Sequence, residues 1–230
     1  MKRLFVQAYV NHNLGDDLFL HILFERYKNV QFRLMTNGIG HQFRQYPNVE
    51  LSKQPSPCLM LRILSKTLRM LSMFGGSMQL WKLAWRKYLV RQSMKCDAYL
   101  YIGGSIFMQH SKGFRFTDLL NGWIAEIFKD KFILGANFGP YQEDAYLSFY
   151  QRKVFPSYLD ICFRDQYSCS LFSNMSNVRY CQDIVFQLKK NRNNNVLKKS
   201  IGFSVMDFSN REDIDGKLNR VYIQKVKEAI

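Results

Sequence analysis

Short apolar runs and amphipathic stretches alternate along most of the chain. The apolar runs are rich in β-branched and aromatic residues and have the length of strands, at 4–10, 32–36, 98–103, 132–137, 161–164 and 178–181. The stretches between them repeat apolar residues at helical spacing, at 18–27, 59–74, 80–90, 119–128, 145–155 and 167–172. This alternation predicts an α/β fold with a doubly wound, Rossmann-like and mainly parallel sheet. The continuously apolar strands predict that helices cover both of its faces.

The pattern changes after Phe186. Residues 189–195 are polar, rich in Lys and Asn, and without apolar periodicity, so we interpret 189–199 as a linker and 1–188 as an N-terminal Rossmann-like domain. Beyond the linker the pattern predicts a strand at 200–206 and an amphipathic helix at 218–230. One strand and one helix cannot enclose a core. We therefore expect 200–230 to be the start of a second Rossmann-like domain that is incomplete, or to dock on the first.

Positive charge is concentrated in one part of the sequence. The 230 residues contain 33 Lys and Arg against 18 Asp and Glu, and the segment 51–96 contains no acidic residue. The net charge of +15 favours anionic partners such as phosphates, acidic lipids or nucleic acid. No zinc-finger spacing or RRM core indicates specific nucleic-acid binding. The predicted helix at 59–74 has a basic stripe, which is typical of a helix on an anionic membrane surface or of one packed on the sheet with the stripe in solvent.

The sequence carries no recognisable secretory signal or membrane-spanning stretch. The basic start leads at once into the short run 4–10, without a cleavage site, and no run approaches the ~20 uncharged apolar residues that a spanning helix needs. We expect a cytoplasmic protein, with peripheral attachment to the inner face of the membrane as an alternative. The five cysteines form no C-x-x-C pair, and no metal site is predicted.

The first candidate site residues follow the first predicted strand. The loop contains Asn13, Gly15, Asp16 and Asp17 and leads directly into a helix. In doubly wound sheets this junction lies at the carboxyl edge, where ligands bind. We expect Gly15 to permit a tight turn and Asp16 or Asp17 to cap the helix. In the simplest alternative, helix capping is the only role of these aspartates. Because carboxylates occupy the place of a phosphate at a helix start, the loop suits sugar hydroxyls or proton transfer better than an anion.

The strand predicted at 98–103 ends in Gly103, Gly104 and Ser105. Consecutive small residues allow backbone N–H groups to converge on an anion, and the serine hydroxyl adds a donor. A plain strand-to-loop turn is the alternative, since Gly-Gly is common in turns.

Later strands also end in polar residues, which we expect along the same edge of the sheet. They are Asn137 and Gly139 after the strand at 132–137, Arg164, Asp165 and Ser168 after the strand at 161–164, and Asp183 after the strand at 178–181. Arg164 is the candidate cation, with a structural ion pair to Asp165 as the alternative. Together the strand ends predict a polar cleft that Asp16 and Asp17 face, together with Gly104, Asn137 and Arg164.

The order of these motifs resembles the polysaccharide pyruvyltransferase family. Its pattern combines an N-x-G-D-type loop, a G-G-S turn, G-x-x-x-G-P, R-D-x-x-S and D-x-x-F, found here at 13–17, 103–105, 135–140, 164–168 and 183–186. The combination and order carry the resemblance, which covers 4–186. It implies two Rossmann-like domains arranged as in B-type glycosyltransferases, with the active site between them.

The resemblance implies transfer of a pyruvyl group from phosphoenolpyruvate to hydroxyls of a surface polysaccharide or of its lipid-linked precursor. It implies no cofactor besides this donor substrate. Arg164 and the turn at 103–105 suit the anionic donor, whereas Asp16 and Asp17 suit proton transfer or sugar hydroxyls. Asp16, Asp17 and Arg164 are therefore our candidate catalytic residues, and the other strand-end residues are candidates for substrate binding.

In one respect the sequence departs from the family pattern. The family's second domain carries a segment with Arg and His, and none follows Ser200 here. We therefore expect the donor to lie against that domain, and this chain by itself to hold part of the saccharide with little activity, unless two copies complete the cleft by dimerising. The alternatives are a B-type glycosyltransferase with a nucleotide-sugar donor and a non-catalytic basic module that binds anions or membrane surfaces.

Overall fold

The computed structural model describes residues 1–11, 13–55, 74–188 and 216–229. The predicted linker, the predicted strand at 200–206 and nearly all of the predicted basic helix at 59–74 lie outside these residues. The chain divides into two compact units, Met1–Leu188 and Lys189–Ile230. The second unit contains helix α7 (Gly216–Ala229), close to the helix predicted at 218–230. Its assignment to a second Rossmann-like domain stays a prediction.

The first unit is built on one seven-stranded sheet in which every strand pair is parallel. The strand order is β3-β2-β1-β4-β5-β6-β7. The strands are β1 (Arg3–Gln7), β2 (Gln31–Thr36), β3 (Val49–Lys53), β4 (Ala98–Ile102), β5 (Asp130–Ala136), β6 (Asp160–Phe163) and β7 (Val178–Tyr180). The predicted doubly wound, Rossmann-like α/β fold is thereby confirmed.

The helical elements of the first unit include those predicted at 18–27, 80–90, 119–128 and 167–172, the first two of which begin several residues earlier than predicted, and two 3₁₀ helices that were not predicted, at 41–45 and 184–187. They are α1 (Leu14–Arg26), η1 (His41–Gln45), α3 (Phe74–Ser93), α4 (Phe116–Ile127), α5 (Asp144–Phe149), η2 (Tyr150–Val154), η3 (Phe155–Ser157), α6 (Gln166–Leu171) and η4 (Ile184–Gln187). The single helix predicted at 145–155 is wrong, because the chain passes from α-helix to a π-helical turn and then a 3₁₀ turn around Pro156. Strand β3 was not predicted, since its alternating apolar and polar residues form a short edge strand rather than a buried apolar run.

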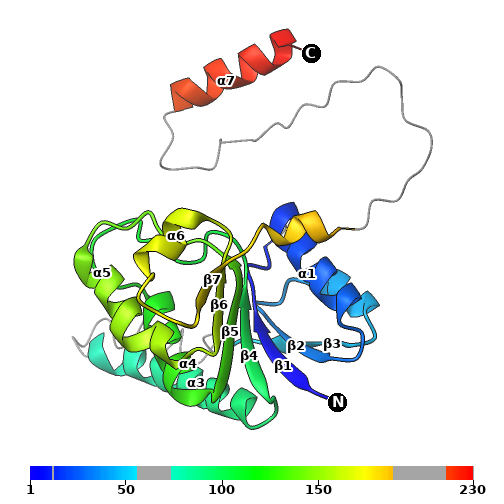
Figure 1. Cartoon of the computed structure of the whole chain (residues 1–230), viewed down its shortest axis with the longest axis vertical. Coiled ribbons are helices and arrows are strands. Elements are labelled where there is room, and N and C mark those ends of the chain that lie inside the picture. The colour runs from blue at the N-terminus through cyan, green and yellow to red at the C-terminus, as the bar shows by residue number, and fades with distance from the viewer. Residues whose placement is uncertain (12, 56–73, 189–215, 230) are drawn as a thin grey trace. The chain divides into compact units, whose positions relative to one another are not determined.

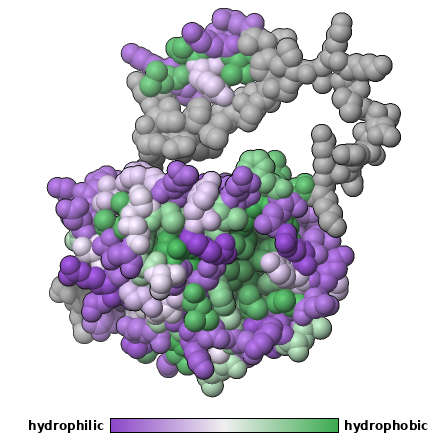
Figure 2. Space-filling view, viewed as in Figure 1, coloured by the Kyte–Doolittle hydropathy of each residue, from purple (hydrophilic) through white to green (hydrophobic). Residues whose placement is uncertain are grey.

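Successive strand residues point to opposite faces of the sheet and so divide the core into two layers. In β1, Phe5 joins the layer covered by α3, α4, α5 and α6, while Val6 joins the layer covered by α1. In β4, Tyr101 joins the same layer as Phe5, and Ile102 joins the same layer as Val6. Figure 1 shows the strands between these two sets of helices, and Figure 2 shows hydrophobic residues gathered in the middle of this unit, flanked by hydrophilic ones.

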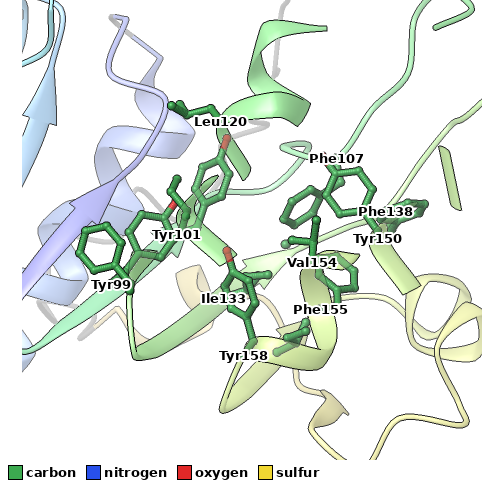
Figure 3. Close-up of a cluster of buried hydrophobic side chains, with 14 of the residues drawn as sticks. Tyr99, Tyr101, Phe107, Leu120, Ile133, Phe138, Tyr150, Val154, Phe155 and Tyr158 are labelled. Atoms are coloured by element: carbon green, nitrogen blue, oxygen red, sulfur yellow. The ribbon is translucent and has the colours of Figure 1, made fainter. Parts of the chain in front are cut away.

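Aromatic side chains dominate the layer beneath α3 and α4. Phe107, Phe138, Tyr150 and Phe155 are at most 2% exposed, and their rings meet mostly edge to face at centroid distances of 5.2–6.1 Å. Figure 3 shows these rings packed beside Tyr99, Tyr101 and Tyr158. Burying one such ring stabilises the fold by roughly 1.5–3 kcal/mol. Phe107 and Phe138 follow β4 and β5, so this packing also fixes the loops at the carboxyl ends of those strands.

The order of the strands creates a topological switch point between β1 and β4. The chain leaves β1 through α1 toward β2 on one side, and leaves β4 through the loop 103–115 and α4 toward β5 on the other. The two connections therefore diverge above neighbouring strands. In open parallel sheets the crevice at such a point, outside the carboxyl ends of the strands, is the usual ligand site.

Candidate functional site

A cavity of about 680 Å³ lies at the switch point. Segments that follow β1 and β4 line most of it, and Arg164 adds a side chain from the end of β6. Its lining residues are Ala8, Tyr9, Asn13, Gly15, Asp16, Phe19, Tyr101, Gly104, Ser105, Ile106, Met108, His110, Arg115, Thr117 and Arg164. An aromatic and apolar lining with a few convergent polar groups is typical of a small-molecule site.

A second cavity of about 640 Å³ lies along the same edge of the sheet and shares Ser105 and Arg164 with the first. Its lining residues are Ser105, Asn137, Phe138, Gly139, Pro140, Arg164, Asp165, Tyr167, Ser168 and Asp183. Of the thirteen residues predicted from sequence, the two cavities therefore bring together all except Asp17 and Gly103. Their roles toward a ligand stay a prediction.

The start of α1 differs from the prediction. Asn13, not an aspartate, caps the helix, because its side-chain oxygen accepts hydrogen bonds from the backbone N–H groups of Gly15 and Asp16 at 3.0 and 3.3 Å. Gly15 lies within the first helical turn rather than in a tight turn before it. Asp17 lines neither cavity, and one of its carboxylate oxygens accepts a 3.4 Å hydrogen bond from Gln42.

Asp16 reaches from α1 into the switch-point cavity. Its carboxylate lies beside the turn that follows β4, where a Cβ atom on Gly103 would stand 3.6 Å from Asp16 Oδ1. Burial raises the pKa of the Asp16 carboxyl, and the Gly104 N–H and the Arg164 guanidinium partly oppose this rise. A half-buried carboxyl with a raised pKa is suited to exchange protons with a ligand.

Arg164 is held by neighbours from three strand ends. Its guanidinium donates to Asp183 at 2.8 Å and to Asn137 at 3.1 Å. The alternative pairing with Asp165 is therefore wrong. The guanidinium also lies against Gly104, where a Cβ atom would stand 2.5–2.8 Å from its atoms. Only glycine allows this approach, which explains a glycine at residue 104.

Asp165 and Ser168 are bonded within the protein. Both carboxylate oxygens of Asp165 accept from Ser168, one from its backbone N–H and one from its hydroxyl, each at 2.7 Å. The Ser168 oxygen accepts in turn from the Phe138 backbone N–H at 2.7 Å. The pair thus caps α6 and ties it to the loop after β5.

The loop 103–115 and the start of α4 bring to the cavity residues that were not predicted as site residues, among them His110, Arg115 and Thr117. Arg115 occupies the N-cap position of α4. Short polar side chains are favoured there, and a cation opposes the helix dipole. Because the sequence predicted this helix only from residue 119, it gave no signal that Arg115 stands at the start of the helix.

The family comparison agrees with this architecture. The sequence model of the family described as polysaccharide pyruvyl transferase matches residues 13–229, from the cap of α1 to the end of α7. A search among curated proteins finds no matching relative. Since the match spans nearly the whole sequence, the chain belongs to the polysaccharide pyruvyl transferase family.

Proposed function

We propose that this protein takes part in the transfer of a pyruvyl group from phosphoenolpyruvate to hydroxyls of a polysaccharide or its lipid-linked precursor. Family membership supports a transferase of this kind. The lining of the switch-point cavity supports this assignment at the site, because it includes Asp16 and two arginines, Arg115 and Arg164. The reaction has two requirements. Cationic groups must bind the anionic donor, and another group must exchange protons with the reactants.

The chemistry of ketal formation explains why these groups belong together. The methylene carbon of phosphoenolpyruvate gains a proton, two sugar oxygens bond to its central carbon, and the bond from that carbon to the phosphate oxygen breaks. One hydroxyl proton accounts for the new methyl hydrogen and the other leaves with phosphate, so no oxidant or reductant is required. Asp16 is our candidate for the proton transfers, because it lines the cavity and burial raises its pKa.

The remaining lining suits a saccharide. Asn13, Ser105 and Thr117 offer amide and hydroxyl groups, and Tyr9 and Tyr101 offer aromatic surface. Burial raises the pKa of Tyr101 to about 12, so its hydroxyl stays protonated at neutral pH. These residues are proposed to hold the acceptor, with its hydroxyls near Asp16.

A comparison of two donor classes tests the proposal. Phosphoenolpyruvate and uridine diphosphate are titrated separately into the purified chain, and their binding is measured by calorimetry. The chain is then incubated with phosphoenolpyruvate and a panel of glycans, with phosphate release and product mass as readouts. We expect saturable binding of phosphoenolpyruvate and phosphate release only in the presence of an acceptor. Binding of the nucleotide without any binding of phosphoenolpyruvate would instead indicate a glycosyltransferase.

We also propose that the protein contacts an anionic membrane peripherally. The described helix that suits this contact is α3, through its exposed side. No helix of the described residues is long and apolar enough to cross a membrane. A surface hollow on α3 combines exposed apolar residues with cations, namely Leu83, Arg86, Lys87, Val90, Arg91 and Met94. Flotation tests this proposal: the chain should stay with anionic vesicles at low salt, and Val90→Asp should release it. Equal retention on neutral vesicles would contradict it.

A further inference from the structure

We propose that Arg115 forms the phosphate-binding subsite of the switch-point cavity. This inference deepens the proposed function and rests on it for the identity of the ligand. The cavity has two arginines, Arg115 and Arg164. They differ in one decisive respect, which is whether the protein itself neutralises their charge.

Arg164 is neutralised from within. Asp183 lies 2.8 Å from its guanidinium, Asn137 accepts a second hydrogen bond, and the side chain is 29% exposed. An anion that binds Arg164 must compete with the Asp183 carboxylate, and it also meets the nearby charge of Asp16. Arg164 is therefore a poor primary site for a doubly charged phosphate.

Arg115 has no carboxylate partner among the described residues. Its guanidinium donates to the backbone carbonyl of Met108, and its Nε atom is buried without a hydrogen-bond partner in that part of the chain. Asp118, three residues along the chain, makes no ion pair with the Arg115 guanidinium, and both of its oxygens accept other hydrogen bonds. One accepts from the Arg115 backbone N–H at 2.8 Å and the other from the Tyr150 hydroxyl at 2.7 Å. The positive charge of Arg115 thus stays available to a ligand.

The loop that carries Arg115 is held rigidly against the next strand end. The side-chain oxygen of Gln109 accepts from the backbone N–H groups of Gln142 and Glu143, at 2.8 and 3.1 Å. The Glu143 carboxylate accepts in return from the Gln109 amide and from the Gly113 backbone N–H, at 3.0 and 2.6 Å. A cation positioned in advance loses little conformational entropy when it binds an anion.

A phosphate ester is the ligand chemistry that fits. Arginine presents a planar fork of donors that matches phosphate oxygens, and His110 lines the same cavity with a further nitrogen. The ester has two sources in the proposed reaction: the donor phosphoenolpyruvate, or a sugar phosphate at the linked end of the acceptor. Both place a phosphate beside the groups proposed to bind sugar hydroxyls.

Three ligands and three variants test the assignment by calorimetry and melting temperature. Inorganic phosphate, phosphoenolpyruvate and glucose 1-phosphate are titrated into the wild-type chain, Arg115→Gln, Arg115→Lys and Arg152→Gln. Arg152 is the matched control, because it is an exposed arginine outside both cavities and its replacement removes the same charge. We expect about 10-fold weaker phosphate binding for Arg115→Gln, partial rescue by lysine, and no change for Arg152→Gln.

The outcomes separate the inference from the function on which it rests. A larger loss for phosphoenolpyruvate than for glucose 1-phosphate supports the donor as the source, and the reverse supports the acceptor. Wild-type phosphate binding by Arg115→Gln overturns the assignment. Equal losses in the lysine and glutamine variants, with lower melting temperatures in both, also overturn it, because Arg115 is then only a loop anchor. If the wild-type chain binds phosphate and uridine diphosphate but not phosphoenolpyruvate, the proposed function fails while the subsite stands.

Discussion

The two walls of the cleft carry similar charged residues and use them differently. The β5–β7 wall, formed by Asn137, Arg164, Asp165, Ser168 and Asp183, bonds most of its polar atoms to one another or to the backbone. The β4 wall, formed by residues 104–117, keeps Arg115 without a carboxylate partner among the described residues. A charged residue in a motif can thus hold the sheet edge together, whereas the arginine that we propose as a ligand site lies outside every motif.

This difference follows from the connections above each strand. Strands β5, β6 and β7 are followed by short segments that bring caps and ion pairs onto the neighbouring strand end. Strand β4 is followed by a longer loop that passes over the switch point before α4 begins. A site is expected where side chains face a cavity and still have donors to offer.

The largest effect is expected for Arg164→Ala, as a loss of stability. The change leaves the Asp183 carboxylate, 22% exposed, without its ion pair, and we expect the free energy of unfolding to fall by roughly 2 kcal/mol. Arg179→Ala is the matched control, since Arg179 pairs with Asp160 at 2.7 Å but is 51% exposed. It should lower stability by less than about 1 kcal/mol. Equal losses in urea unfolding would contradict a structural role for Arg164.

A smaller effect is expected for Gly104→Ala. The new methyl group would meet the Arg164 guanidinium, which must then leave Asn137 or Asp183. We expect a loss of about 1 kcal/mol, the size of one net hydrogen bond. Gly122→Ala on α4 serves as the control, because its Cβ would meet only the Phe149 ring at 3.5 Å and alanine favours a helix. Unfolding curves in which Gly104→Ala is as stable as the control would refute the contact.

The smallest effect on stability is expected for Asp16→Asn, and it depends on pH. A carboxyl whose pKa is raised in the folded state contributes stability below its unfolded pKa of about 3.9, and this contribution is lost as pH rises through the folded value. At neutral pH the variant should therefore be as stable as the wild type or more stable, although it loses the proposed proton exchange. Melting temperatures measured between about pH 3 and about pH 8 test this.

Asp144→Asn controls for the loss of a first-turn carboxylate, since Asp144 is an exposed residue in the first turn of α5. The contradicting result is a melting temperature of Asp16→Asn at neutral pH that falls further below the wild type than that of the control. In that case burial of the Asp16 charge does not destabilise the fold, and the assignment of Asp16 as the proton-exchanging group loses support.

Sequence reasoning predicted the fold because strand and helix periodicity suffices for a parallel α/β sheet, and a parallel sheet brings the ends of its strands to one edge. It placed Asp16, Gly104 and Arg164 together for that reason. It did not predict that Asn13 caps α1 or that Arg164 pairs with Asp183, because both depend on side-chain directions. Arg115 was missed because its place at the cavity depends on the path of the loop 103–115.

We propose that ligands bind at the switch point, against the β4 wall and the start of α1. Amide chemical-shift mapping by NMR, with phosphoenolpyruvate titrated into the isotope-labelled chain alone and together with an acceptor glycan, tests this most directly. We expect the amides of 13–16 and 104–117 to shift with ligand concentration, while those of Asp165, Ser168 and Val185 change little. Shifts confined to the β5–β7 wall, with the amides of 104–117 unmoved, would contradict it.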